Sequence, residues 1–91
     1  MYIAYPLAIS WYVAEKILAK HRITIDDIEA SVRSPAQYVR KGRGNDIYEI
    51  LSRSLDGVLV VLRKLSGARY RLITARSMTD SERRYYAKHR R

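Results

Sequence analysis

The sequence predicts an α+β domain in which two helices are followed by an antiparallel sheet and a last helix. Three observations predict it: apolar residues at helical spacing in the first third, β-branched residues between turn signals in the middle, and a helix-capping signal near the end. The 91 residues fit one domain, 1–91, and show no internal repeat or linker.

The first helix is expected over Trp11 to His21. Ser10 can cap it, and its apolar residues form one stripe that can face a core. Residues 2–9, which contain Pro6, indicate an edge strand or an extended lead-in.

The second helix and the last one share a start signal. In each, a threonine is followed three residues later by a carboxylate, so that each side chain can bond the backbone N–H of the other residue. The two pairs are Thr24 with Asp27 and Thr79 with Glu82. Pro35 ends the second helix, whereas the last helix is rich in Arg and Tyr and runs to the end of the chain.

An antiparallel meander of three to four strands is expected between these helices. The sequence Asp56-Gly57 is a strong signal for a two-residue hairpin turn. The expected strands are Gln37 to Lys41, Asp46 to Ser54, Val58 to Leu65 and Arg69 to Ala75.

Two-residue turns would assign the strand residues to two faces of the sheet. The core face would carry Leu51, Arg53, Leu55, Val58, Val60, Leu62 and Ile73. The half-open face would carry Tyr48, Ser52, Ser54, Arg63, Tyr70, Thr74 and Arg76 among Ile50, Leu59, Val61 and Leu72. A slip of one residue would exchange the two faces.

The positive charge is concentrated near the C-terminus. The net charge is +9, residues 1–59 hold 8 basic and 7 acidic side chains, and residues 60–91 hold 10 and 2. Thirteen of the 18 cations are arginine, whose planar guanidinium suits phosphate contacts and stacking on bases. This favours a nucleic acid as the partner over the alternatives of a solvated basic face or a patch for an acidic protein.

Composition and motifs exclude several classes of protein. Without cysteine the chain has no disulfide, thiolate metal site or cysteine nucleophile. The longest apolar run, Val58 to Leu62, is too short to span a bilayer, and the first residues lack the features of a secretory signal. Motifs of nucleotide-cofactor, zinc-hydrolase and serine-hydrolase sites are absent from the sequence. We therefore expect a cytoplasmic protein with no cofactor, no metal and no membrane partner.

Some basic and aromatic residues are candidates for RNA contact. Lys20 and His21 close the first helix, where the helix dipole favours cations, but an imidazole can also move a proton during 2′-hydroxyl attack on a phosphate. Guanidinium groups stabilise charge on phosphate oxygens and aromatic rings stack on bases, although exposed arginines also keep a small protein soluble. The expected RNA-binding residues are Arg63, Arg69, Arg71, Tyr70, Arg83 and Arg84.

Three segments resemble the BrnT-type toxins of bacterial toxin–antitoxin pairs, which have a RelE/ParE-like fold. Residues 15–24, EKILAKHRIT, are similar to that family's E-K-N-x-x-K-H-G-I-T. Residues 48–57, YEILSRSLDG, are similar to Y-x-x-x-G-R-[ST]-x-x-G, and residues 73–86, ITARSMTDSERRYY, to I-[ST]-A-R-x-[MA]-[ST]-x-x-E-R-x-x-Y. The chain departs from the family at Ile17, where asparagine is common, and at Arg22 and Ser52, where glycine is common.

The resemblance implies a type II toxin: a metal-independent endoribonuclease that cuts RNA, with or without the ribosome, and inhibits translation. A cognate acidic antitoxin would neutralise it, in a heterotetramer or with the toxin as a homodimer. Carried over to this sequence, the catalytic residues would be Arg76, Arg53, His21, Lys20 and Tyr48. Arg53 and Arg76 would stabilise the phosphate, while Lys20, His21 or Tyr48 would assist proton transfer.

Two other interpretations remain open. A non-catalytic RNA- or protein-binding module on the same scaffold is favoured by the missing glycines and by the lack of an unambiguous acid–base pair. A gyrase-directed inhibitor is suggested only by related folds.

Overall fold

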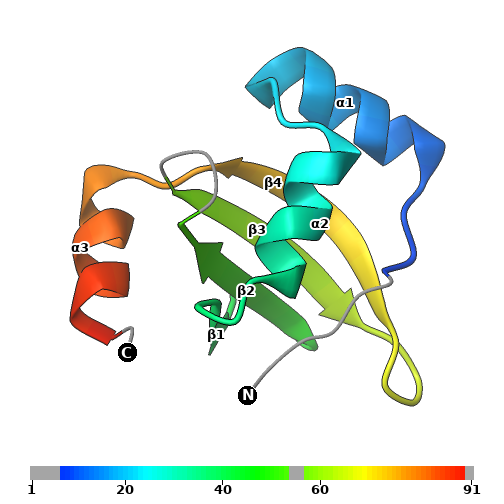
Figure 1. The fold of residues 1–91 in the computed structure, drawn as a ribbon. Helices are drawn as coiled ribbons and strands as arrows, with labels where there is room; N and C mark the ends of the chain where they lie inside the picture. The colour runs from blue at the N-terminus through cyan, green and yellow to red at the C-terminus, as the bar shows by residue number, and fades with distance from the viewer. Residues whose placement is uncertain (1–6, 54–56, 90–91) are drawn as a thin grey trace.

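The structure, a computed structural model, describes residues 7–53 and 57–89. In chain order the elements are α1 (Trp11–His21), α2 (Ile25–Arg33), β1 (Tyr38–Lys41), β2 (Ile47–Ser52), β3 (Val58–Lys64), β4 (Tyr70–Ser77) and α3 (Asp80–His89). The strands form one antiparallel sheet in the order β1-β2-β3-β4 (Figure 1). This confirms the predicted α+β fold with two helices before a meander and one after it.

The helix starts are those that the capping signals predict. Ser10 Oγ accepts the Val13 N–H at 3.5 Å at the start of α1. In α2, Thr24 Oγ1 accepts the Asp27 N–H at 3.1 Å, and Asp27 Oδ2 accepts the Thr24 N–H at 2.9 Å. Each bond satisfies a backbone donor that has no partner within its helix, so these residues fix where the helices begin.

The C-terminal end of α1 has a less favourable backbone conformation than its start. Arg22 caps it with φ 58° and ψ 31°, and its N–H donates to Leu18 O at 3.0 Å. This left-handed conformation costs a residue with a Cβ about 1–2 kcal/mol, whereas glycine adopts it freely. A glycine at this position would therefore relieve the strain that Arg22 carries.

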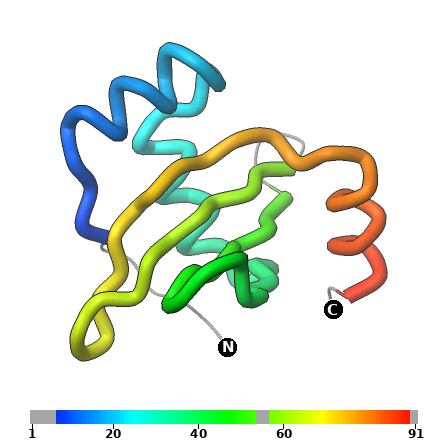
Figure 2. The backbone as a smooth tube through the Cα atoms, turned by 180° about the vertical axis from the view of Figure 1, so that it is seen from behind, coloured from blue at the N-terminus to red at the C-terminus, as the bar shows by residue number. Residues whose placement is uncertain are grey.

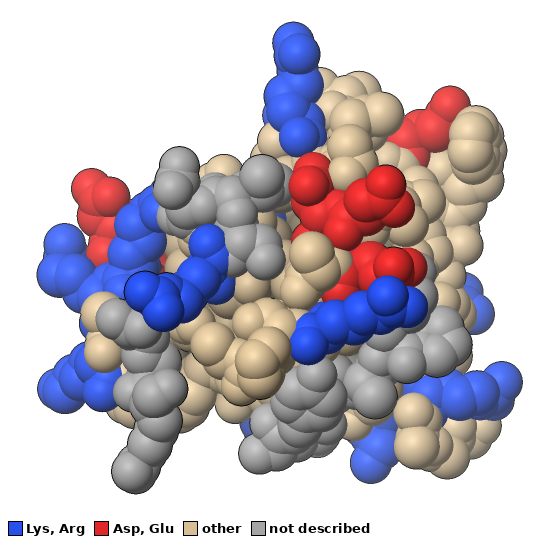
Figure 3. Space-filling model, in the orientation of Figure 1, with Lys and Arg blue, Asp and Glu red and all other residues tan. Residues whose placement is uncertain are grey.

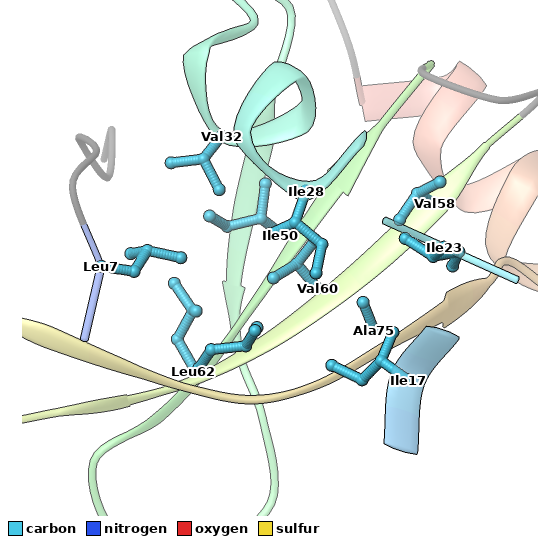
Figure 4. Packing of buried hydrophobic residues seen from close by; sticks show 11 residues of the cluster. Leu7, Ile17, Ile23, Ile28, Val32, Ile50, Val58, Val60, Leu62 and Ala75 are labelled. Carbon is cyan, nitrogen blue, oxygen red and sulfur yellow. The ribbon is translucent and has the colours of Figure 1, made fainter. Parts of the chain in front are cut away.

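The helices cover both faces of the sheet. Helices α1 and α2 pack on one face, and α3 folds over one end of the other (Figures 1 and 2). The larger core joins the two N-terminal helices to β2, β3 and β4 and includes Ile17, Ile23, Ile28, Val32, Ile50, Val58, Val60, Leu62 and Ala75 (Figure 4). A smaller core under α3 consists of Leu51, Leu59, Met78 and Tyr86.

The predicted register of the first hairpin is wrong. Ser52 pairs with Val58 and Ile50 with Val60, so residues 53–57 connect the strands instead of a two-residue turn. Ile50, and not Leu51, therefore shares a face with Val60. The alternation of apolar and polar residues does not show whether Ile50 or Leu51 shares a face with Val60, because both residues are apolar and both faces of the sheet are covered at this point. The expected positions of Ser54 and Leu55 lie outside the described residues.

The corrected register also moves two candidate residues. Arg53 is exposed beyond the end of β2 and is not part of the sheet. Tyr48 lies on the face covered by α1 and α2, where it packs against the larger core, and does not share a face with Arg76.

Strand β4 lies at one edge of the sheet and extends to Ser77, two residues beyond the predicted end. Ala8 forms a parallel bridge to it, since the Ala8 N–H donates to Tyr70 O and the Leu72 N–H donates to Ala8 O, both at 2.9 Å. This part of the lead-in is extended, as predicted, while residues 2–6 lie outside the description. Within the described ranges, no helix has the length and apolar character needed to cross a bilayer.

Two isoleucines of α2 provide a matched test of the packing. Ile28 is fully buried under the sheet, whereas Ile25 is 39% exposed. Ile28→Ala should lower the free energy of unfolding by about 2–5 kcal/mol, the usual cost of truncating a buried Ile. Ile25→Ala should cost less than about 1 kcal/mol because less apolar surface is lost. Urea denaturation measures both, and equal costs would contradict the described packing of α2.

Candidate functional site

The side chains of Arg76 and Glu82 join the end of β4 to the first turn of α3. Arg76 Nη1 donates to Glu82 Oε1 and Arg76 Nη2 donates to Oε2, both at 2.8 Å, in the two-pronged geometry that suits these groups. Oε1 of Glu82 also accepts the Thr79 N–H at 2.8 Å, and the Glu82 N–H donates to Thr79 Oγ1 at 3.2 Å. The predicted capping box of the last helix is confirmed, and an ion pair holds Arg76 beside it.

This ion pair changes the acidity of both groups. The hydrogen bonds from Arg76 lower the pKa of Glu82 from its ordinary value of 4.5 to about 2, although burial opposes the shift. The same bonds raise the pKa of Arg76. Both side chains therefore carry their charge throughout the physiological pH range.

A second arginine completes a network of two cations and two anions. Arg40 Nε on β1 donates to Glu49 Oε1 at 2.7 Å, and its Nη2 lies 3.7 Å from Glu82 Oε2. The four charges sum to zero, which weakens the attraction of this cluster for an anion. Arg76 also donates from Nη1 to Ser77 O at 3.1 Å, which leaves the Nε–H and one Nη2–H without a partner among the described residues. Arg76 is thus fixed by one edge of its guanidinium while the other edge can still meet a phosphate.

Two further arginines lie at this end of the sheet. Ser52, Val58 and Ser77 are paired across the last positions of β2, β3 and β4, and exposed Arg53 follows Ser52 directly. From α3, the guanidinium of Arg83 lies over Gly57, where an added Cβ would come within 2.9 Å of Arg83 Nη1.

The backbone at Gly57 favours glycine, because its φ is +110°, which L side chains rarely adopt. A Cβ there would also displace the ends of the flexible side chains of Met78 and Arg83. Arg84 is exposed on the same helix. Figure 3 shows Lys and Arg gathered over α3 and around the β3–β4 turn, with Asp and Glu over α2 between them.

The end of α1 reaches the same end of the sheet. Helix α1 runs along β4 (Figures 1 and 2), and Figure 4 shows Ile17 beside Ala75 and Ile23 beside Val58. Since Val58 pairs with Ser77, the residues that close α1 are carried toward the end of the sheet that holds Arg76.

Lys20 and His21 line a cleft of about 240 Å³ between α1 and β4. The cleft also contacts Thr74, which precedes Arg76 by two residues on β4 and shares its face in the strand pairing. Four of the predicted catalytic residues, Lys20, His21, Arg53 and Arg76, therefore lie toward one end of the sheet, with Arg76 on the face that α3 covers and Lys20 and His21 on α1, which packs on the other face.

Tyr48 is not among them. It pairs with Leu62 near the opposite end of the sheet, and its ring packs edge-on against that of Tyr70 with centroids 6.1 Å apart. Both rings are half-buried against the larger core on the face of α1 and α2. They stabilise the fold at a position remote from Arg76.

The remaining predicted RNA-binding residues form a second basic region at that opposite end. Arg63 and Arg71 are exposed and directly paired across β3 and β4. Arg69 lies in the turn, where its Nη2 donates to Ser66 Oγ at 3.0 Å. The predicted set is therefore divided, with Arg83 and Arg84 near Arg76 and the others at the far end of the hairpin.

Sequence reasoning missed an aromatic cluster beside the ion-pair network. The rings of Tyr85 and His89 stack with centroids 4.1 Å apart, Tyr38 meets Tyr85 edge-on at 5.8 Å, and the guanidinium of Arg40 lies 4.8 Å from the Tyr85 ring. The spacing of four between Tyr85 and His89 would have indicated one helix face, but the pairing with β1 depends on the fold.

The cleft likewise contains Tyr12 and Lys16, which were not among the site residues predicted from the sequence. Their spacing of four, repeated at Lys20, places all three on one side of α1 and is the signal that would have identified them. Within residues 7–53 and 57–89, no group of three or more His, Asp or Glu side chains is arranged to hold a metal ion.

The ion pair makes stability depend on pH. Because the pKa of Glu82 is lower in the folded protein than its ordinary 4.5, its contribution is complete above that value and is lost as the pH falls toward about 2. Glu82→Gln should lower the free energy of unfolding at neutral pH by about 1.5–3 kcal/mol, the range for hydrogen bonds to charged groups, and flatten its decline in acid.

Glu29→Gln is the matched control, because half-buried Glu29 forms an i,i+4 pair at 3.1 Å with exposed Arg33. It should cost no more than about 0.5 kcal/mol. Urea denaturation between about pH 2 and 7 follows both variants, and parallel curves for the Glu82→Gln variant and the wild type would contradict the role given to Glu82.

The comparisons with protein-family models and with curated proteins add nothing to what the geometry of the site shows. No protein-family model matches the chain, and no curated protein matches it either. What the site does must therefore be inferred from its residues and from the three segments quoted above.

Proposed function

We propose that the protein is the toxin of a type II toxin–antitoxin pair, a metal-independent endoribonuclease that inhibits translation. The observation that carries the proposal is that Lys20, His21, Arg53 and Arg76 all lie toward the same end of the sheet. They come from three segments far apart in the sequence, and they are four of the five residues to which the resemblance assigns catalysis.

The chemistry requires no metal. The 2′-oxygen of the RNA attacks the adjacent phosphate, the bond to the 5′-oxygen breaks, and a 2′,3′-cyclic phosphate forms as the 2′-proton leaves and the 5′-oxygen gains one. Arg53 and the free edge of Arg76 stabilise the charge on the phosphate oxygens. The imidazole of His21 moves a proton, and Lys20 beside it supplies a positive charge. Tyr48 has no part in this scheme.

The surroundings of the site agree with the partners proposed for such a toxin. Exposed Arg84 and half-buried Arg83 extend the positive surface from Arg76 along α3, which suits either the RNA backbone or a cognate acidic antitoxin. The proposal places the protein in the cytoplasm, where its RNA substrate is found.

A second candidate is a module that binds RNA without cutting it. It is favoured by the network around Glu82, since Arg76 and Arg40 are balanced there by two carboxylates. A fully compensated arginine stabilises a phosphate less than a free one does.

Cleavage of RNA in the presence of a chelator tests the leading proposal. Arg53→Ala should reduce the cleavage rate about 10²-fold, the usual effect of losing one donor to transition-state charge. Because Arg53 is exposed, the variant should unfold at the same temperature as the wild type. Arg43→Ala, an equally exposed change in the turn between β1 and β2, should leave the rate unchanged. Equal rates in all three proteins would show that the site is wrong, and RNA binding by an inactive wild type would favour the module.

Arg76→Lys tests the other arginine without removing the cation beside Glu82. A lysine can keep one ion pair with the carboxylate but lacks the second edge of the guanidinium. We expect a loss of stability of about 1 kcal/mol in urea denaturation and a drop in cleavage of about tenfold or more. A stable variant with full activity would remove Arg76 from the reaction.

A further inference from the structure

The cleft between α1 and β4 has the features of a small binding site. It holds about 240 Å³, below the roughly 300 Å³ at which pockets for drug-sized ligands begin. Ile17 is buried at its base, Tyr12 and Lys16 are exposed along α1, and Thr74 contributes from the strand. The site therefore combines an apolar base with an aromatic ring, a hydroxyl and amino groups.

An irregularity in β4 shapes one wall of this cleft. Val61 pairs with Thr74 and Leu62 with Leu72, so Ile73 is an extra residue without a partner on β3. In a regular strand, successive side chains point to opposite faces. Here the adjacent residues Ile73 and Thr74 both line the cleft. Bulges re-aim side chains in this way and are frequent beside functional sites.

The two sides of α1 differ in charge. On the side of the cleft, the described lining residues include Lys16 and Lys20 and no carboxylate. On its other side, a groove between α1 and α2 is lined by Glu15 and Asp26. The cleft therefore attracts an anion, and the acidic groove on the far side of the helix does not share this preference.

Tyr12 is free to accept a planar group. Its side chain is 66% exposed, and the ammonium of Lys16 lies 5.3 Å from the centre of its ring. An exposed tyrosine beside a cation is the arrangement on which proteins stack a nucleobase and hold its phosphate.

We infer that this cleft binds one nucleotide unit, with the base against Tyr12 and the phosphate between Lys16 and Lys20. The volume of the cleft exceeds what a phosphate alone needs, since even a water molecule takes only about 30 Å³ in the liquid. The apolar floor of the cleft at Ile17 suits an organic ring and not a second anion.

The inference rests on the proposed function in taking the nucleotide as part of RNA. Thr74 and Arg76 are two residues apart on β4, which is about 7 Å along a strand. A nucleotide held in the cleft is thus next to the site of cleavage. Stacking on Tyr12 requires a base that is not paired, so the substrate is single-stranded RNA.

Titration of the ¹⁵N-labelled protein with adenosine 5′-monophosphate, inorganic phosphate and a short single-stranded RNA tests the inference. The mononucleotide and the RNA should both shift the amide signals of α1 and of Ile73 and Thr74. Tyr12→Leu should weaken binding of both about tenfold, the effect of losing one base stacked on one ring, and leave the weak binding of phosphate unchanged. Lys16→Ala should weaken the binding of all three probes.

Lys41→Ala is the matched control, because Lys41 is exposed on β1 at the opposite edge of the sheet. If RNA is cleaved while the cleft signals do not move and Tyr12→Leu and Lys16→Ala bind RNA like Lys41→Ala, the cleft is overturned and the proposed function stands. If the mononucleotide binds the cleft but RNA is neither bound nor cut, the proposed function is overturned and the cleft is a site for a free nucleotide.

Discussion

The carboxylate of Glu82 is the point on which the arrangement of the second face of the sheet depends. It caps α3 through Thr79, forms a two-pronged ion pair with Arg76 on β4 and lies near Arg40 on β1. These contacts fix the angle at which α3 leaves the sheet and returns over it, so that Tyr86 covers the smaller core. The positions of Arg76 and of the arginines on α3 follow from this one group, which also balances part of their charge.

The helices could be predicted from the sequence because their signals are local. Ser10, Thr24 and Thr79 each bond to a residue three positions away, and such a pattern is visible without knowing the fold. The strands could be predicted for a similar reason, since turn residues separate the apolar segments. The ends of the strands differ by one or two residues from the expected ones.

The register and the details of the site could not be obtained in the same way. Ile50 and Leu51 are both apolar and both faces of the sheet are covered, so the alternation of apolar and polar residues does not determine the pairing of β2. This pairing decides that Tyr48 is far from Arg76. The cleft beside α1 depends on the extra residue at Ile73, which no periodicity in the sequence predicts. Lys20, His21, Arg53 and Arg76 lie toward one end of the sheet because of pairings between segments far apart in the sequence, which no periodicity predicts.

The pairing of Arg63 with Arg71 has a consequence for the energetics of the free protein. The two arginines are directly paired across neighbouring strands, and like charges in this position repel. A polyanion laid along the hairpin would relieve that repulsion, so its binding would stabilise this end of the sheet.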